Sequence, residues 1–227
     1  YCGIIADNTY LYLGTDNGIL VYNYRTDKYE QPDTDFPTDV RTMVLQGDTL
    51  WIGSLNGLYT YQLKSRQLNH FDSKQTGLPH NTIYSIIHTK DNQIYIGTYN
   101  GLCRYVQASG KFENILLPVN RGGSNLFVNS LLEDAARQCI WIGMEGYLFQ
   151  YNPTIGEMKA IEVFHNNSIK SLALDGDENL LAGTDNGLYV YQNDKEPLQH
   201  IIHDSRNIQS LTNNIIWNIF SDQEHNI

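Results

Sequence analysis

Tyr95-Ile96-Gly97-Thr98-Tyr99-Asn100-Gly101 is the segment from which the architecture of this chain can be worked out. An aromatic and an aliphatic residue precede the first glycine, and a turn-forming Asn-Gly pair ends the segment. Segments of the same kind occur at residues 12–18, 51–57, 141–146 and 181–187 of the 227-residue sequence. Repetition of one short pattern indicates a fold that uses a single supersecondary unit several times.

The first glycine of each segment, here called the anchor glycine, recurs at a steady interval. The anchor glycines are Gly14, Gly53, Gly97, Gly143 and Gly183, which are 39, 44, 46 and 40 residues apart. Repeats of about 40–50 residues are typical of four-stranded propeller blades. A tyrosine follows every anchor glycine by eight residues, at positions 22, 61, 105, 151 and 191. This fixed offset predicts two strands and a turn that keep one register in all copies.

The turn and the flanking segments complete the unit. Asn-Gly at 17–18, 56–57, 100–101 and 186–187 predicts a two-residue type I′ turn, in which both residues have positive φ. Glu145-Gly146 replaces this pair in the fourth copy and predicts another turn type between the same two strands. A strand of alternating character precedes four of the anchors, at 40–44, 83–87, 128–132 and 169–173. The sequence begins inside this strand of the first repeat, at Cys2-Gly3-Ile4, and a further copy at 216–220 starts the sixth repeat. A fourth strand follows the tyrosine, as at 111–114. Each unit is therefore expected to contain four antiparallel strands.

We predict an all-β chain, a β-propeller of four-stranded antiparallel blades, because stacking such sheets buries their apolar faces. The propeller segment is expected to cover residues 1–227, with five full repeats and the start of a sixth. Both ends of the sequence fall inside a repeat, which predicts a fragment that forms an open arc. A parallel β-solenoid fits the hairpins poorly, and the period-2 pattern excludes helical repeats.

Composition excludes several classes of function. The net charge is −10, and no cluster of Lys and Arg is present, so a nucleic-acid partner is not expected. No apolar run approaches the roughly 20 residues that span a bilayer. Cys2, Cys103 and Cys139 show no C-x-x-C spacing, which argues against zinc or redox chemistry and favours three partly buried strand residues.

No catalytic residue, metal site or cofactor is predicted. A glycosidase needs two facing carboxylates, but Asp16, Asp91, Asp185 and Asp222 occupy turn or loop positions, where Asp bonds its own backbone. The histidines show no spacing that would bring them together around a metal. They are His70, His80, His88, His165, His200, His203 and His225.

One repeat position varies in chemistry in a way that suits recognition. Aligning the first strands places Cys2, Arg41, Tyr84, Asn129, Lys170 and Trp217 in one column. The next column is small or polar and is interpreted as structural: Gly3, Thr42, Ser85, Ser130, Ser171 and Asn218. We predict that Arg41, Tyr84, Asn129, Lys170 and Trp217 contact a ligand or partner domain, with Arg41 and Lys170 favouring an acidic sugar. The alternative is that these side chains only pack between blades.

Three segments show a family resemblance. Residues 77–83 (Gly-Leu-Pro-His-Asn-Thr-Ile), together with 95–105, resemble the two-component-regulator propeller repeat, and residues 210–216 resemble the start of another copy. The resemblance implies a seven-bladed propeller in the periplasmic sensor region of a Bacteroides-type hybrid two-component histidine kinase. It also implies carbohydrate breakdown products as signals, and a membrane anchor and kinase on other residues. Neighbouring propeller and sandwich domains and a second copy in a homodimer are the implied partners.

Three functions are compatible with these features. The first is a non-catalytic, periplasmic, oligosaccharide-sensing module. The second is a propeller enzyme, a glycosidase or a lyase, that acts on polysaccharide. The third, an intracellular scaffold of the WD type, is disfavoured because tyrosine stands where that repeat ends in Trp-Asp. A membrane helix and kinase motifs in the full gene would separate the first from the second.

Overall fold

A computed structural model describes residues 3–6, 9–30, 34–119, 126–164, 167–192, 199–222 and 227. Its described helices are one turn each, α1 (Ser73–Thr76) and the 3₁₀ helix η1 (Glu162–Phe164). Within those residues, no helix has the length and apolar character needed to cross a membrane. Cys2, His165 and His225 fall outside the described residues.

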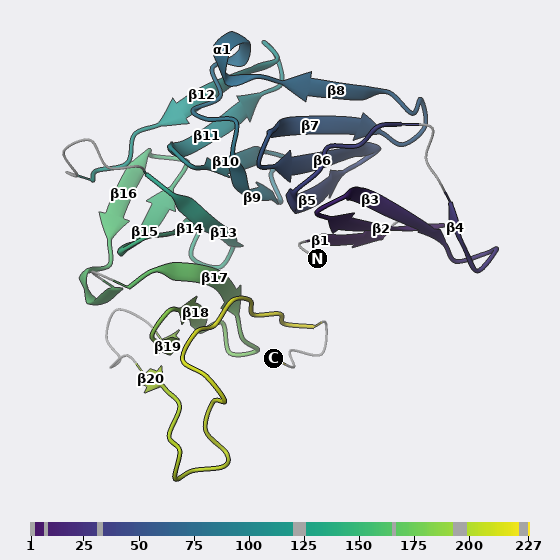
Figure 1. Cartoon of the computed structure of the whole chain (residues 1–227). Helices are drawn as coiled ribbons and strands as arrows, with labels where there is room; N and C mark the ends of the chain where they lie inside the picture. The colour runs from purple at the N-terminus through teal and green to yellow at the C-terminus, as the bar shows by residue number, and fades with distance from the viewer. Residues whose placement is uncertain are drawn as a thin grey trace. The chain divides into compact units, whose positions relative to one another are not determined.

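The chain divides into two compact units, residues 1–128 and 129–227, which are described separately. The first unit contains three four-stranded antiparallel sheets, the first, second and third blades (Figure 1). Their strands are β1 (Gly3–Ala6), β2 (Tyr10–Thr15), β3 (Gly18–Asn23), β4 (Lys28–Glu30), β5 (Val40–Gln46), β6 (Thr49–Ser54), β7 (Gly57–Gln62), β8 (Leu68–Phe71), β9 (Ile83–His88), β10 (Ile94–Thr98), β11 (Gly101–Val106) and β12 (Lys111–Ile115).

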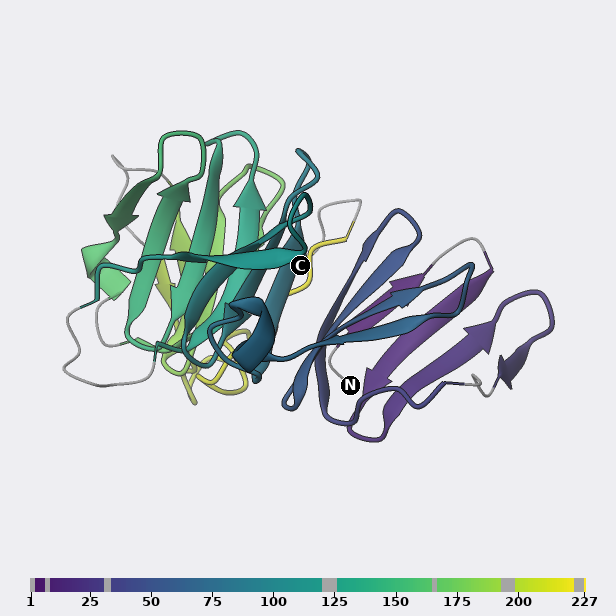
Figure 2. The same cartoon turned by 90° about the horizontal axis from the view of Figure 1, so that it is seen from above.

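The second unit contains the fourth and fifth blades, apart from Val128, which begins β13 at the end of the first unit. Their strands are β13 (Val128–Asp134), β14 (Cys139–Met144), β15 (Tyr147–Asn152), β16 (Glu157–Ala160), β17 (Ile169–Leu174), β18 (Leu180–Thr184), β19 (Gly187–Tyr191) and β20 (Gln199–Ile201). Strands that follow each other in sequence are neighbours in every sheet (Figure 2). The predicted all-β fold of four-stranded antiparallel blades is therefore confirmed.

The tyrosine eight residues after each anchor glycine has a packing role. The pairs Leu50↔Tyr61 and Leu180↔Tyr191 show that it keeps the same register in different blades. It also reaches the aromatic residue before the anchor glycine of the preceding blade. Tyr105 lies 4.9 Å from Trp51 and Tyr191 lies 6.2 Å from Trp141, both as edge-to-face ring pairs. Such pairs stabilise the stacking of neighbouring blades.

The apolar cores lie between neighbouring sheets, as the propeller prediction requires. The core between the second and third blades is centred on Trp51, Leu58, Ile83, Ile96 and Cys103. The core between the fourth and fifth blades is centred on Cys139, Trp141, Leu148, Phe164 and Ile169. Burial raises the pKa of the Cys103 and Cys139 thiols, so both behave as small apolar side chains.

The anchor glycine is required because the next blade packs directly against it. A Cβ atom on Gly97 would lie 2.6 Å from Val128 Cγ1 and 2.8 Å from the Val128 carbonyl oxygen. A Cβ atom on Gly53 would lie 2.6 Å from Ile83 Cγ2. The small residue of the neighbouring column faces the same glycine, as in the pair Gly97↔Ser85. The sequence suggested that the column of small or polar residues is crowded. The structure shows the cause, which is contact with the anchor glycine and with an aliphatic residue of the next blade.

The predicted type I′ turn is wrong. Gly18, Gly57, Gly101 and Gly187 have φ values of 109°, 151°, 117° and 103°, but the preceding asparagines do not have positive φ. The glycine is the first residue of the following strand, and the turn is held by the residue after the anchor glycine. Thr98 Oγ1 accepts a hydrogen bond from Asn100 N (3.1 Å) and donates one to Gly101 O (2.9 Å). Met144 replaces this hydroxyl in the fourth copy, where the turn differs as predicted and still joins the same strands.

We expect Thr98→Val to lower the free energy of unfolding by about 2 kcal/mol, because it removes the hydroxyl partner of one buried and one partly buried backbone group. Thr98 is fully buried. Thr15 makes the same two bonds in a half-exposed turn, where water can replace them, so Thr15→Val is the matched control with an effect below about 1 kcal/mol. Urea denaturation measures both. Equal shifts for the two variants would contradict this role of the buried hydroxyl.

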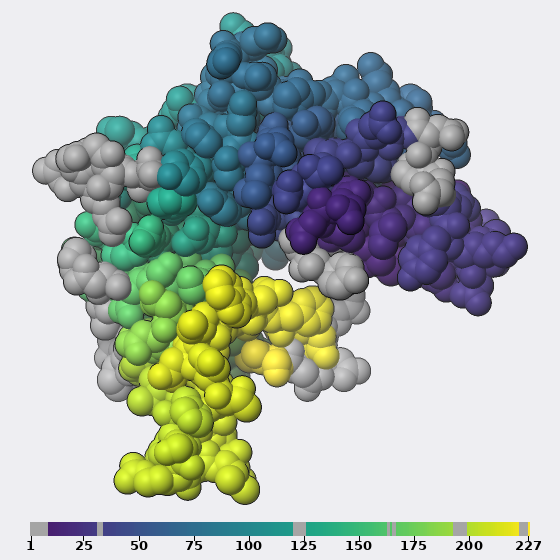
Figure 3. Space-filling model, viewed as in Figure 1, coloured from purple at the N-terminus to yellow at the C-terminus, as the bar shows by residue number. Residues whose placement is uncertain are grey.

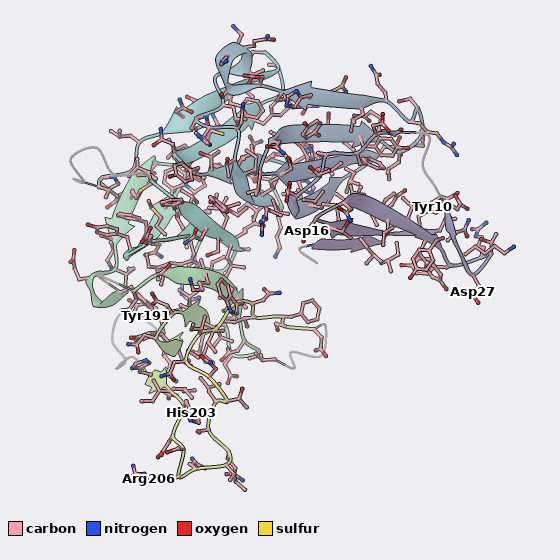
Figure 4. The ribbon with its side chains drawn as sticks, in the orientation of Figure 1. Tyr10, Asp16, Asp27, Tyr191, His203 and Arg206 are labelled. Carbon is pink, nitrogen blue, oxygen red and sulfur yellow. The ribbon has the colours of Figure 1, made fainter. Side chains whose placement is uncertain are left out.

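The strand predicted at 216–220 does not form within the described residues. Ile216 is positioned like the first residue of a new blade, because its N–H donates to Thr184 O (2.8 Å) and its side chain covers Gly183. Residues 217–222 have no ladder partner among the described residues, and a strand needs one. This segment and the long connection after β20, which carries His203 and Arg206, lie on the surface of the second unit (Figures 3 and 4).

Candidate ligand-binding site

Two members of the predicted recognition column lie at β-bulges in the first unit. Between β5 and β6, Val40 pairs with Ser54 and Thr42 pairs with Gly53, so Arg41 is the extra residue. Between β9 and β10, Ile83 pairs with Thr98 and Ser85 pairs with Gly97, so Tyr84 is the extra residue. A bulged residue has no partner in the ladder, and its side chain is redirected.

The fifth blade of the second unit repeats this irregularity. Ile169 pairs with Thr184 and Ser171 pairs with Gly183, which leaves Lys170 as the extra residue. The residue before the bulge is aliphatic and packs on one anchor glycine. The residue after the bulge is small and faces a different anchor glycine. The position between them lies outside the strand pairing, which is consistent with a chemistry that varies from copy to copy. The sequence shows the variation but does not by itself show the bulge.

In the first unit, Arg41 and Tyr84 lie within electrostatic range of each other. The Arg41 side chain is exposed and Tyr84 is half-buried. Burial raises the pKa of the Tyr84 phenol, Tyr99 raises it further, and Arg41 opposes the change. The ring centroid of Tyr84 lies 6.0 Å from that of Phe127. Arg41 makes no ion pair with another described residue.

In the second unit the other three column residues have different surroundings. Asn129 Nδ2 donates to Ile169 O (3.1 Å) and so joins two first strands. Lys170 Nζ lies 4.8 Å from the ring centroid of Trp217, within the range of a cation–π interaction. Trp217 is 73% exposed, so most of its ring remains open to solvent. Packing between blades therefore accounts for Asn129 better than for Trp217.

The candidate acids and histidines do not form a reactive cluster in the described parts of the chain. Asp16 lies in the turn between β2 and β3 (Figure 4), and Asp185 Oδ1 accepts from Ser168 N (3.2 Å). His70 and His200 stack on Tyr59 and on Tyr189 in separate units. No group of three His, Cys, Asp or Glu side chains lies close enough to hold a metal among the residues with described positions.

A small recess lies elsewhere in the first unit. It has a volume of about 200 Å³ and is lined by Gln46, Asn92, Arg104, Tyr105 and Gln107. Its polar groups largely bond to the protein itself. Gln46 joins Trp51 to Asn92, and Arg104 pairs with Glu113 at 2.7 Å. Few of its donors remain for a ligand, which makes the bulge residues the better candidates.

Comparison with known proteins concerns the repeat and the fold. The family model described as "Two component regulator propeller" matches residues 77–100, which run from the loop before β9 through the anchor of the third blade. Residues 77–100 of this chain therefore match a two-component-regulator propeller repeat. Tyr84, His80 and Tyr99 lie within the matched residues.

Solved structures extend the similarity of these repeats to nearly the whole chain. The extracellular domain of BT4673 from B. thetaiotaomicron, designated a hybrid two component system, is 78% identical, with a TM-score of 0.95 over 99% of this chain. The extracellular domain of BT3049 from the same organism is 20% identical over 98% of this chain, with a TM-score of 0.76, and shows the shared fold. A protein named Histidine kinase P4 from Formosa agariphila is 25% identical over 161 residues, 63% of this chain.

The propeller repeats of this chain make up only a part of these relatives. The chain spans 30% of the BT4673 chain, 31% of the BT3049 chain and 11% of Histidine kinase P4. The matched parts of BT4673 and BT3049 belong to extracellular domains.

Proposed function

We propose that this chain is a non-catalytic, periplasmic, ligand-sensing part of a hybrid two-component sensor that responds to oligosaccharide breakdown products. The observation that carries the proposal is the 78% identity to the BT4673 extracellular domain over 99% of the chain. At that identity the two chains share their fold and most of their residues. The kinase and the membrane anchor would lie on other residues of the same protein.

The bulge residues give this proposal its chemistry. Arg41, Tyr84 and Lys170 are the bulged residues of three different blades, each held by its own four-stranded sheet. Tyr84 and Trp217 offer ring faces, and Arg41 offers donors for hydroxyl or carboxylate groups. Lys170 is engaged with Trp217, so Arg41 is the stronger candidate for reading an acidic sugar. Neighbouring domains of the same chain, or a second copy, would complete the sensor.

A glycan-binding screen on the intact extracellular region tests the proposal. We expect an oligosaccharide to bind, and we expect Tyr84→Ala or Trp217→Ala to weaken its affinity by more than about tenfold, which corresponds to 1.4 kcal/mol. Tyr29→Ala is a suitable control, because Tyr29 is 68% exposed on the outer strand β4. Unchanged affinity in both column variants would make that column structural.

The enzyme alternative makes the opposite prediction. If the chain is non-catalytic, the purified region binds polysaccharide fragments without converting them, because its described acids serve turns and its histidines are dispersed. Chromatography of the bound glycan before and after long incubation measures this. Turnover that disappears when one Asp or Glu is changed would replace the sensor proposal with a glycosidase or a lyase.

A further inference from the structure

Four aromatic rings form a continuous chain at one end of the third blade. His80 and Tyr99 have ring centroids 5.0 Å apart at an angle of 33°, and Tyr99 and Phe127 lie 4.2 Å apart. Phe127 in turn contacts Tyr84, the bulged residue of β9. His80 precedes β9, Tyr99 lies between β10 and β11, and Phe127 precedes β13. All four rings are partly exposed.

The repeat does not require a ring at the position of Tyr99. The equivalent residues two places after the other anchor glycines are Asp16, Leu55, Glu145 and Asp185. Each of them follows the same anchor and leads into the same pair of strands. The aromatic residue is therefore specific to the third blade, and the needs of the hairpin do not explain it.

The position of His80 likewise does not require an aromatic ring. His80 Nδ1 accepts from Thr82 N (3.0 Å), and Asn213 Oδ1 accepts from Ile215 N (2.8 Å) at the equivalent place in the later loop. An asparagine can thus make this turn. The histidine adds a ring face beside Tyr99. Because Nδ1 accepts, the neutral ring carries its proton on Nε2, which has no partner among the described residues and can donate.

Polar donors accompany these rings. Arg41 is exposed, lies within electrostatic range of Tyr84 and has no ion-pair partner among the described residues. Its guanidinium has five N–H donors, which suit vicinal hydroxyl groups. Ring faces carry negative partial charge and attract polarised C–H groups, while the donors address oxygen atoms. Apolar faces beside a few convergent polar groups are what orient small ligands in binding sites.

We propose that His80, Tyr99 and Tyr84 of the third blade, together with Arg41 of the second, form a sugar-binding platform. One pyranose ring of an oligosaccharide stacks with its C–H face against the His80–Tyr99 pair and accepts a hydrogen bond from His80 Nε2. Hydroxyl groups of a neighbouring sugar unit accept from Arg41 beside Tyr84. This inference rests on the proposed function and deepens it, because it assigns the stacking contact to two residues outside the recognition column. A glycan that binds through Trp217 alone would not use this platform.

The test uses the intact extracellular region and a panel of neutral disaccharides and trisaccharides together with oligogalacturonides. Tyr99→Leu removes the ring and introduces the residue that the second blade has at this turn, so the fold is expected to survive. We expect Tyr99→Leu and Arg41→Gln each to weaken binding of the retained sugar about tenfold by isothermal titration calorimetry. Tyr24→Leu, on the first blade and 45% exposed, is the matched control and is expected to leave affinity unchanged.

The outcomes separate the two proposals. If a sugar binds the wild type and Tyr99→Leu retains full affinity with an unchanged melting temperature, the platform is wrong and the sensor proposal stands. If Tyr24→Leu weakens binding as much as Tyr99→Leu, the platform is also wrong. If no sugar of the panel binds the wild type, the proposed carbohydrate signal itself fails. His80→Asn keeps the turn and is expected to lose affinity, and unchanged affinity there would remove His80 from the platform.

Discussion

Gly97→Ala is expected to destabilise the chain by about 3 kcal/mol, the upper part of the range for overpacking a dense core. The new Cβ atom would lie 2.6 Å from Val128 Cγ1 and 2.8 Å from the Val128 carbonyl oxygen. A side chain can rotate away, but a backbone carbonyl in the next first strand moves only if the strand moves. The midpoint of urea unfolding measures the loss.

Gly156→Ala supplies the control for this prediction. Gly156 lies in an open turn with φ of +71° and has nothing within 4 Å of the added Cβ atom, so only backbone strain of about 1 kcal/mol is expected. A larger effect at Gly97 than at Gly156 would show that blade stacking, and not backbone conformation, demands the anchor glycine. Equal effects would contradict the packing account.

Asp134→Asn is expected to lower the free energy of unfolding by about 3 kcal/mol at neutral pH, because it breaks a buried ion pair on one side. The Asp134 side chain is fully buried at the end of β13. It accepts from Trp141 Nε1 (3.0 Å), Arg137 Nη1 (2.7 Å) and Arg137 N (3.0 Å). The partial exposure of Arg137 places the effect at the lower end of the range for such pairs.

The pH dependence of this effect follows from the same contacts. Burial alone would raise the pKa of Asp134, but the hydrogen bonds from Trp141 and Arg137 outweigh it, so the pKa lies below its ordinary value. The stabilisation is complete above the unfolded pKa of about 3.9 and is lost as the pH falls through the lower folded value. The difference between wild type and Asp134→Asn should therefore shrink in acid, in urea titrations at pH values of about 7 and about 3.

Asp204 provides a matched comparison for Asp134. It also accepts from the backbone N–H and the guanidinium of a nearby arginine, Arg206, but its side chain is 43% exposed. Exposed pairs contribute little, so Asp204→Asn should leave the unfolding midpoint nearly unchanged. The free energies of unfolding of the wild type and Asp134→Asn could instead differ by the same amount at both pH values. That result would show that the shape of the Asp134 side chain, and not its charge, explains the destabilisation.

Sequence reasoning predicts the blades well because each feature of the repeat has a local cause. The anchor glycine and the tyrosine eight residues later recur in all five blades, and each of these blades has the expected first and fourth strands. The turn type could not be obtained from Asn-Gly alone. Its conformation depends on a buried hydroxyl, such as that of Thr98, whose role appears only when its burial and bonds are known. The recurring Thr or Ser after the anchor glycine was the available clue.

The candidate site is less accessible from sequence. The alignment isolates the column of Arg41, Tyr84 and Lys170, but the bulges that free these side chains depend on pairing with the next strand. The contact between Lys170 and Trp217 joins residues far apart in the sequence. Tyr99 and His80 occupy ordinary turn positions, so only their ring distances reveal them as neighbours of Tyr84 through Phe127.

A crystal structure of the intact extracellular region with its bound oligosaccharide would test most directly whether the first-strand bulges carry recognition. We expect sugar atoms within hydrogen-bond distance, about 3 Å, of Arg41 or in ring contact with Tyr84, Tyr99 or Trp217. A sugar bound at full occupancy on another surface, in contact with neither the column residues nor His80 or Tyr99, would contradict this role of the bulges.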